Sequence, residues 1–477
     1  MRMTALILIL GFLTITIGGG VLLRSSYKQG NLQETIIQKA MPAGQSASTT
    51  LMVQKAFGME APRTYLVLFL NNTEIRPGGG FIGSYALFNV NRGKPDIIKV
   101  EGTENLDNAA AEVGIDPPPA LAKYLGIKKM QLRDSNWSPD FPTDARLALE
   151  LYKSERGAEA EHIDGVIAVT PTLFEEILKI TGPVKADGVE FTSENFTEKL
   201  EYEVEYGYKA RGQDFSDRKK LLGDLSKALL PRLVTTSFTH WNDYLRLIAK
   251  MLNEKQIMLY SIYPDEQEHI ISERWDGSVR TSTGDFLLWT DANLGALKTD
   301  VAIQRTLSYD ISPTTSGKLV ASATMHYHHT GGFTWRTTRY RDYVRIFVPA
   351  GSKIISVTGS TELTVNGVKN AKPAEGDENG KHWFGTYLAV EPGKQAALSF
   401  TYILPDNIKK NVDDGSYSLL VQKQSGTINT RLTLGLNFGK KLTTALPPES
   451  SEKFGDSNYD QVSDLREDRY FEIGIIK

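Results

Sequence analysis

The sequence predicts a mixed α/β sheet flanked by helices, followed by an all-β sandwich, behind an N-terminal transmembrane helix. Thr4 to Leu23 is an uncharged run of 20 residues, long enough to cross a bilayer. From Pro62 to about Thr235, strand-like and helix-like patterns are mixed. Beyond about Val301, apolar and polar residues alternate with period two, which is typical of sandwich strands.

The composition is that of an ordinary globular protein of 477 residues, which favours two or three domains. There are 54 basic and 57 acidic residues, a net charge of −3, and no long run of one sign. This balance argues against general nucleic-acid binding. The chain has no cysteine, which excludes disulfides and thiolate metal sites.

The apolar run near the N-terminus has two interpretations. A cleaved signal peptide has a shorter apolar region that ends in a small-residue cleavage site. Here Gly18–Gly20 is followed by Val21–Leu23, with no A-x-A pattern. We therefore predict an uncleaved anchor over residues 1–28 in the cell membrane, with the bulk of the chain extracytoplasmic, and a helical stalk and linker over 29–61.

The α/β domain is predicted over residues 62–300. Strands are expected at Tyr65–Leu70, from Phe81 onward, at Gly165–Val169 and at Gln256–Ile262. Helices are expected from four apolar stripes, with starts near Thr143, Thr172, Ser193 and Ser216 or Asp217. Gly182 should end the second helix, and Pro231 should end or kink the fourth. The stripes of the last two helices consist of Phe196, Leu200, Val204, Tyr208, Leu221, Leu222, Leu225 and Leu229.

The sandwich is predicted over residues 301–477. Alternating apolar residues share one face in runs that start at Leu319, Ala396 and Leu432. Turn residues separate these runs, and Lys369–Lys381 is expected to be a mobile loop.

A glycine-rich loop between the first two strands is the leading candidate site. Arg76 and three glycines, Gly78 to Gly80, lie between the strands. Gly79 and Gly80 can turn backbone N–H groups into one concavity, and Arg76 adds a fixed planar charge. The loop therefore predicts an anion site, and a tight hairpin that merely requires glycine is the alternative.

Two nucleotide-binding motifs fit this loop only in part. Gly78, Gly80 and Gly83 match G-x-G-x-x-G, but a dinucleotide fingerprint requires a helix to follow. Ser84 to Val90 is strand-like, and the lysine of a P-loop is absent. A nucleotide site is therefore not expected.

Residues 211–220, RGQDFSDRKK, form a second candidate. Arg218 and Lys219 would lie in the first turn of a helix, where the dipole disfavours cations unless an anion is bound. Together with Arg211, they are predicted phosphate ligands. The alternative is a solvated basic turn in which Asp214 and Asp217 pair locally.

A third segment, LRDSNWSPDFP over residues 132–142, is rich in polar groups and has little periodicity. Asn136 and Asp140 could support a nearby site. A packed connector is the alternative interpretation.

These segments carry a family resemblance. NNTEIRPGGGFIGSYALF, LRDSNWSPDFP and HIDGVIAVTPTLFEEILKITGPV, in this order, resemble the bacterial family numbered four thousand and twelve among the domains of unknown function. More distantly, about Tyr65 to Leu230 resembles the LytR–CpsA–Psr family. Those membrane-anchored enzymes move glycopolymers from a polyprenyl-pyrophosphate carrier onto the cell wall.

The distant resemblance implies an α/β fold with a lipid groove and an arginine-lined pyrophosphate site that binds Mg²⁺. Arg76 corresponds to an arginine after the first strand. Asn71 and Asn72 lie near one aspartate of that family, and Ser84 lies near a second. The segment around Asn136 resembles an asparagine-containing loop of that family, and Arg211, Asp214 and Arg218 resemble its last run of arginines and aspartate. The resemblance implies Asp214 and Asp217 as metal ligands.

This chain also departs from that family. Residues 100–107, VEGTENLD, stand where the family has Pro-Arg-Asp, and the terminal arginine–glutamine pair is replaced around Lys219 to Leu222. Loss of these groups favours binding without turnover, since phosphoryl transfer relies on metal and cationic stabilisation. Two hypotheses follow: an envelope protein that binds a polyprenyl-linked glycan or cell-wall polymer and transfers it, or a non-enzymatic binding protein.

Overall fold

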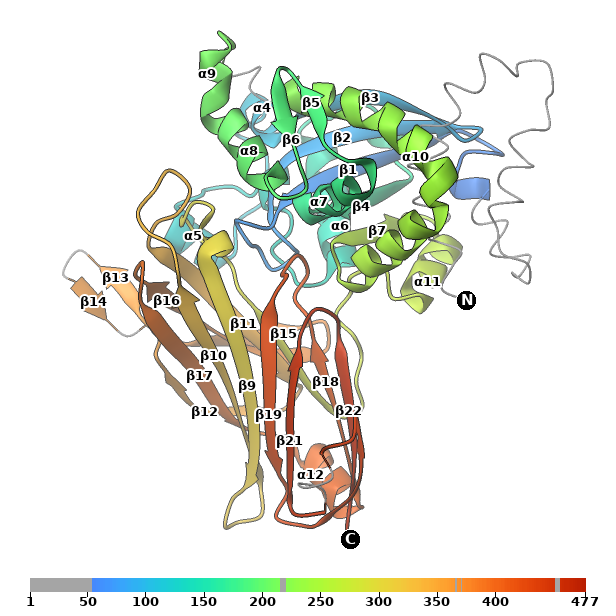
Figure 1. The fold of residues 1–477 in the computed structure, drawn as a ribbon. Coiled ribbons are helices and arrows are strands. Elements are labelled where there is room, and N and C mark those ends of the chain that lie inside the picture. The colour runs from blue at the N-terminus through green and yellow to red at the C-terminus, as the bar shows by residue number, and fades with distance from the viewer. Residues whose placement is uncertain (1–53, 215–219, 365–366, 370, 451–454) are drawn as a thin grey trace.

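The computed structural model describes residues 54–214, 220–364, 367–369, 371–450 and 455–477. An α/β domain lies at one end of an elongated pair of β-sheets, and the C-terminus lies near the other end (Figure 1). Among the described residues, no helix combines the length and apolar character needed to cross a bilayer. The predicted anchor, 4–23, lies outside them.

The α/β domain is built on a five-stranded mixed sheet with the order β3-β2-β1-β4-β7. β1 pairs antiparallel with β2 and parallel with β4. The glycine-rich loop is therefore the connection of a hairpin, and a strand follows it as predicted. The five strands are β1 (Arg63–Asn71), β2 (Phe81–Asn91), β3 (Lys94–Gly102), β4 (Gly165–Val169) and β7 (Ile257–Ser261).

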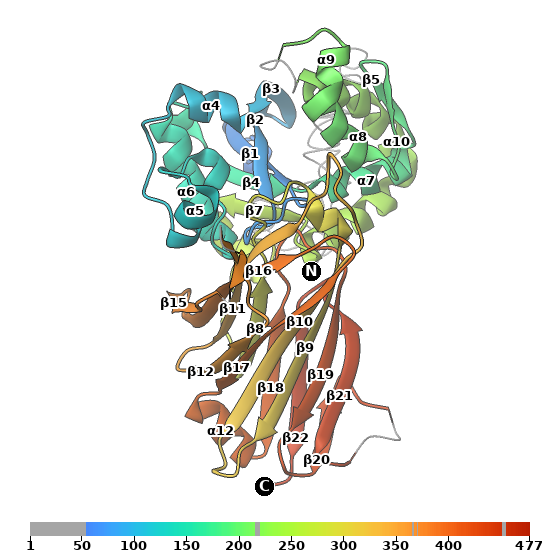
Figure 2. The same cartoon turned by 90° about the vertical axis from the view of Figure 1, so that its left-hand side faces the viewer.

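Helices cover both faces of this sheet (Figure 2). Successive side chains of a strand point to opposite faces. In β1, Leu66 and Leu68 accordingly share a core with α6, while Val67 shares one with α7 and α10. The helices are α4 (Thr103–Ala109), α5 (Pro119–Leu125), α6 (Phe141–Ser154), α7 (Pro171–Thr181), α8 (Phe196–Tyr202), α9 (Tyr208–Ala210), α10 (Lys220–Asn253) and α11 (Pro264–Ser272). A π-helical turn, Glu203–Gly207, joins α8 to α9, and a small hairpin comprises β5 (Val184–Ala186) and β6 (Val189–Phe191).

The helix ends differ from the sequence-based expectation in detail. Asp140, not Thr143, caps α6, because its side chain accepts the amide of Thr143. Gly182 ends α7 as predicted. α10 continues through Pro231, and its backbone leaves helical geometry at His240 instead.

The second domain consists of two sheets with a common core. Tyr309 and Leu436 of one sheet and Val344 and Phe471 of the other are all buried in it. One sheet has the order β12 (Lys353–Thr358), β17 (Gln395–Ile403), β10 (Leu319–His329), β9 (Ile303–Pro313), β19 (Thr430–Asn437), β21 (Asn458–Asp464). The other has the order β15 (Ala374–Glu378), β16 (Lys381–Val390), β11 (Tyr340–Pro349), β8 (Asp285–Thr290), β18 (Ser416–Gln422), β22 (Arg469–Ile475), β20 (Leu442–Leu446). Smaller elements are β13 (Glu362–Thr364), β14 (Gly367–Lys369) and α12 (Asp406–Asp413).

Period-two alternation is confirmed in β10, where every second residue from Leu319 to Tyr327 is buried. Two other expectations differ from the structure. β8 lies before residue 301 yet pairs with β11 and β18, so the sheets of the second domain begin earlier than predicted. Residues 374–378, expected in a mobile loop, form the edge strand β15 paired with β16. Its sequence, AEGDE, lacks the apolar alternation that signals a strand.

Candidate functional site

A cavity of about 330 Å³ lies between the sheet and the helices α7, α8 and α10. Val67 and Phe69 of β1 contribute to its floor. The amphipathic stripes predicted from the sequence supply much of the rest, because their apolar faces turn toward the sheet. These lining side chains are Leu173, Phe174, Ile177, Phe196, Leu200, Val204, Leu222, Leu225 and Leu229.

Contacts place several charged and polar side chains of the lining together, and we call this part of the cavity the polar end. It comprises Asn71, Glu74, Glu201, Glu205 and Lys298. Lys298 Nζ lies 3.3 Å from a carboxylate oxygen of Glu205. The apolar remainder of the cavity can hold hydrocarbon, while this end can hydrogen-bond a polar group.

The carboxylates of the polar end are paired with cations. Glu74 forms an ion pair with Arg76 at 3.1 Å. Burial raises the pKa of Glu74 above its ordinary value, although Arg76 and Lys298 act in the opposite direction. Glu201 pairs with Arg336 at 2.7 Å and accepts a hydrogen bond from the hydroxyl of Thr73.

Arg76 itself is buried beside the cavity and is not part of its lining. Its guanidinium donates to the carbonyl of Ile75 at 3.1 Å and to the carbonyl of Asn293. With Glu74 as a third acceptor, Arg76 fixes the loop against the second domain. It reaches the polar end only through Glu74.

The glycine-rich loop is packed at the domain junction. The amide of Gly79 donates to Arg76 O at 2.9 Å, and that of Gly78 donates to Asn136 O at 3.1 Å. Gly80 has a φ of +148°, and a Cβ there would lie 2.6 Å from the backbone of Asn71. These glycines are therefore required by close packing, as in the hairpin alternative. Of the two amides predicted to cradle an anion, that of Gly79 has an acceptor within the protein.

The supporting polar residues divide into two groups. Asn71 and Ser84 line the cavity. Asn72, Asn136 and Asp140 hold loops in place. The side-chain amide of Asn72 donates to Thr172 Oγ1 at 3.1 Å and to Gly426 O at 3.0 Å. The side-chain amide of Asn136 donates to the carbonyl of Gly80. The carboxylate of Asp140 accepts a hydrogen bond from the backbone amide of Val279 at 2.9 Å.

Arg211 lies apart from the cavity lining. It pairs with Asp187 at 2.9 Å and with Glu203. The other predicted phosphate ligands of this segment, Arg218 and Lys219, lie outside the described residues. Their convergence with Arg76 therefore stays a prediction.

The predicted Mg²⁺ has no ligand set in the part of the chain that the structure describes. Asp214 is exposed, and no group of three or more His, Asp or Glu side chains there is arranged to hold a metal ion. Asp217 lies outside the described residues. We derive no chemical step through a metal ion.

Sequence reasoning missed five charged residues at or beside the polar end, of which Glu74 lies in the glycine-rich loop itself. Glu201 and Glu205 lie one turn apart on the helical segment that carries the predicted stripe. Lys298 and Arg336 come from the second domain, more than 90 residues away in sequence. No local pattern marks such pairs, because they form only when the two domains meet.

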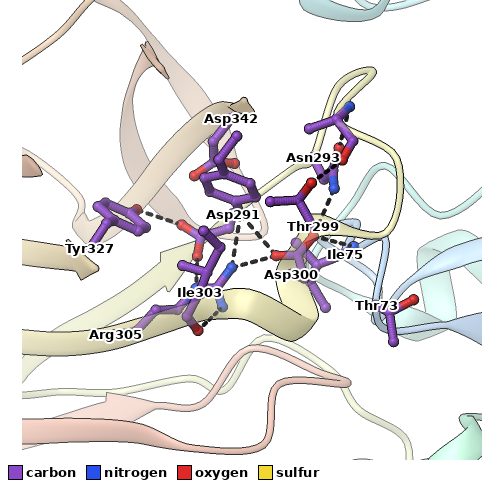
Figure 3. A network of polar contacts seen from close by, with 12 residues as sticks. Thr73, Ile75, Asp291, Asn293, Thr299, Asp300, Ile303, Arg305, Tyr327 and Asp342 are labelled. Carbon is purple, nitrogen blue, oxygen red and sulfur yellow. Dashed lines mark hydrogen bonds and ion pairs between the residues drawn. The ribbon is translucent and has the colours of Figure 1, made fainter. Parts of the chain in front are cut away.

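A buried ionic network connects the polar end to the second domain (Figure 3). The amide of Asp300 donates to Thr73 O at 3.2 Å, and a carboxylate oxygen of Asp300 accepts the amide of Ile75 at 3.1 Å. Arg305 pairs with Asp300 and, at 2.5 Å, with Asp291. The loop before the glycines is thus held by charges on β9 and its neighbours.

The network contains more carboxyl groups than cations. Burial raises the pKa of Asp342 well above its ordinary value, and the neighbouring Asp291 adds to the rise. Burial acts to lower the pKa of Arg305, but its negative neighbours outweigh this and raise it. Asp342 is therefore protonated more readily than an ordinary aspartate, and Asp291 and Asp300 are the carboxylates that pair with Arg305.

Residues 60–205 match the family model described as a protein of unknown function (DUF4012). The DUF4012 segment contains β1 to α8, and therefore four of the five strands of the sheet and two of the three helices that cover the cavity. It does not contain β7, whose Ile257 also lines the cavity. It excludes α10 and Lys298. The comparisons do not show the LytR–CpsA–Psr relationship.

A search of curated proteins gives no match. Solved structures give distant likenesses. A protein of Legionella pneumophila is 8% identical, with 40% of this chain and 71% of that chain covered and a TM-score of 0.25. A Listeria innocua protein is 9% identical, with 45% of this chain and 78% of that chain covered and a TM-score of 0.26. Leukotriene A4 hydrolase from Saccharomyces cerevisiae is 8% identical, with 38% of this chain and 28% of that chain covered and a TM-score of 0.21.

Proposed function

We propose that the α/β domain binds a ligand with a long apolar chain and holds that chain in the cavity. The observation that carries this proposal is the cavity of about 330 Å³ with its aliphatic and aromatic lining. Ligand pockets are typically about 300–1,000 Å³, mostly apolar, with a few placed polar groups. Protein interiors are otherwise close-packed, so a chain that filled this space would gain dispersion contacts that its walls lack.

The polar end suits the head of such a ligand. Lys298 is a cation of the polar end, and Glu74 of the polar end forms an ion pair with Arg76. Burial raises the pKa of Glu74, which makes its carboxylate easier to neutralise. A diphosphate could then replace Glu74 as the acceptor of Arg76. We therefore propose a lipid-linked pyrophosphate or glycopolymer as the ligand class.

The predicted anchor supports an envelope location for this activity. A single span at residues 4–23 would keep the cavity close to the bilayer that supplies a polyprenyl-linked ligand. We propose a single-pass membrane protein with its α/β domain outside the cytoplasm.

Binding without turnover is the form of this function that we favour. In the distant resemblance, Asn71 and Asn72 lie near an aspartate of the transferases. The side-chain amide of Asn72 donates hydrogen bonds to Thr172 and Gly426. Transfer of the glycopolymer to the cell wall is the alternative. Turnover of a lipid-linked glycan by the full chain, abolished in Lys298→Met, would favour transfer.

Chain-length dependence tests the binding proposal. The full chain is titrated with polyprenyl phosphates of increasing length, and bound ligand is measured by native mass spectrometry. Each methylene that enters the cavity should add up to about 0.8 kcal/mol, roughly a fourfold gain in affinity, until the cavity is full. Affinity independent of chain length would contradict the proposal. A polyprenyl diphosphate of the same chain length tests the head group. If it binds wild type more tightly than the monophosphate does, and Lys298→Met removes that difference in affinity, the result supports a pyrophosphate head.

A further inference from the structure

Three aromatic rings form a cluster on the outside of the helical segment that closes the cavity. Tyr202 and Tyr206 lie 5.8 Å apart between ring centroids, and Trp335 lies 5.5 Å and 5.7 Å from them, nearly perpendicular to both. The tyrosines are 46% and 45% exposed. We call these three residues the aromatic cluster. Exposed aromatic groupings of this kind mark binding surfaces more often than isolated exposed rings do.

The local backbone explains why the cluster lies beside the cavity. Tyr202 ends α8, and Tyr206 lies in the π-helical turn Glu203–Gly207. The same segment turns Leu200 and Val204 into the cavity, so its two faces have different roles. Single π-turns inserted in helices are frequent at functional sites.

Trp335 is held next to the polar end by its neighbour in sequence. Arg336 pairs with Glu201 of the polar end at 2.7 Å, and its carbonyl accepts the amide of Lys298 at 3.0 Å. A ligand whose chain occupies the cavity and whose head leaves at the polar end would therefore meet the aromatic cluster next.

We propose that the aromatic cluster binds a sugar ring of the same ligand. This inference rests on the proposed function and adds the chemical class of the group that the ligand carries beyond its diphosphate, an uncharged saccharide. The C–H groups of a sugar face can pack on the negative faces of the rings. The tyrosine hydroxyls and the exposed carboxylate of Glu198, 3.8 Å from Arg336, can hydrogen-bond its hydroxyl groups.

Charge favours a saccharide over a bilayer surface. Tyrosine and tryptophan also occur at membrane interfaces. However, Glu198 and Glu205 flank the cluster, with side chains 65% and 38% exposed. Carboxylates at this position would be repelled by anionic lipid headgroups but not by neutral sugars.

Two detergents with the same tail test this inference. Dodecyl maltoside and dodecyl tetraethylene glycol ether share a twelve-carbon chain and differ in whether the uncharged head is a sugar. Each is titrated into the full chain below its critical micelle concentration. Wild type should bind the maltoside about tenfold more tightly. Trp335→Ala and Tyr206→Ala should reduce this ratio toward one and leave the affinity for the glycol ether unchanged.

Phe333→Ala is the matched control, because Phe333 is 69% exposed on the same loop and outside the three ring pairs. It should keep the wild-type ratio. Equal affinity of wild type for both detergents would overturn the saccharide inference and leave the cavity proposal standing. Failure of both detergents to bind would overturn both. Loss of vesicle binding in Trp335→Ala, with the detergent ratio unchanged, would indicate a membrane-docking role and overturn the inference.

Discussion

Replacement of Arg305 by methionine should lower the free energy of unfolding by about 3–5 kcal/mol. Arg305 is nearly buried and pairs with Asp291 and Asp300, which are themselves buried. Removal of the guanidinium leaves two carboxylates without their counter-charge in a medium of low polarity, and the cost of that desolvation is large. Urea unfolding followed by circular dichroism measures the change.

Arg431→Met provides the matched control. Arg431 lies on β19, beside β9, and is exposed. Its replacement should change the free energy of unfolding by no more than about 0.5 kcal/mol. A loss of the same size in both variants would show that the effect comes from arginine removal in general and not from the buried network.

Replacement of Gly83 by phenylalanine should weaken the binding of a long-chain polyprenyl phosphate at least about tenfold, or 1.4 kcal/mol. Gly83 lines the cavity from β2, and its φ lies outside the left-handed region. The atoms nearest to an added Cβ are those of the Phe81 ring, at 3.9 Å and 4.0 Å. A phenyl group there would occupy space that the apolar chain needs, and each excluded methylene removes about 0.8 kcal/mol.

Gly223→Phe makes the same substitution outside the cavity. Gly223 lies in α10, and nothing stands within 4 Å of an added Cβ. We expect this variant to bind like wild type and both variants to unfold at or near the wild-type midpoint. Undiminished binding by a well-folded Gly83→Phe protein would exclude the cavity as the binding site.

Much of the scaffold could be predicted because short-range patterns determine it. The strands that start at Phe81 and Gly165 begin at the predicted residues, and alternation along Leu319–Tyr327 identifies a buried face. The helical stripe of Phe196, Leu200 and Val204 was expected to be buried, and all three residues line the cavity. Periodicity shows which face turns inward but not whether the space behind it is filled.

The polar contacts between the two domains could not be predicted, because they depend on residues far apart in sequence. Arg76 and the three glycines suggest an anion site when they are considered alone. In the structure, the guanidinium of Arg76 donates hydrogen bonds to the carbonyls of Ile75 and Asn293. Lys298, which has no motif around it, is a cation that lines the cavity. Only contact between the two domains brings it there.

Photolabelling tests the central claim, that the cavity of the α/β domain holds an apolar chain, most directly. A polyprenyl phosphate with a diazirine at the far end of its chain is bound to the full chain, irradiated, and mapped by peptide mass spectrometry. We predict adducts in peptides that contain Phe174, Leu200 or Leu225, and their loss when unlabelled ligand is in excess. Adducts confined to strands of the second domain would contradict the account.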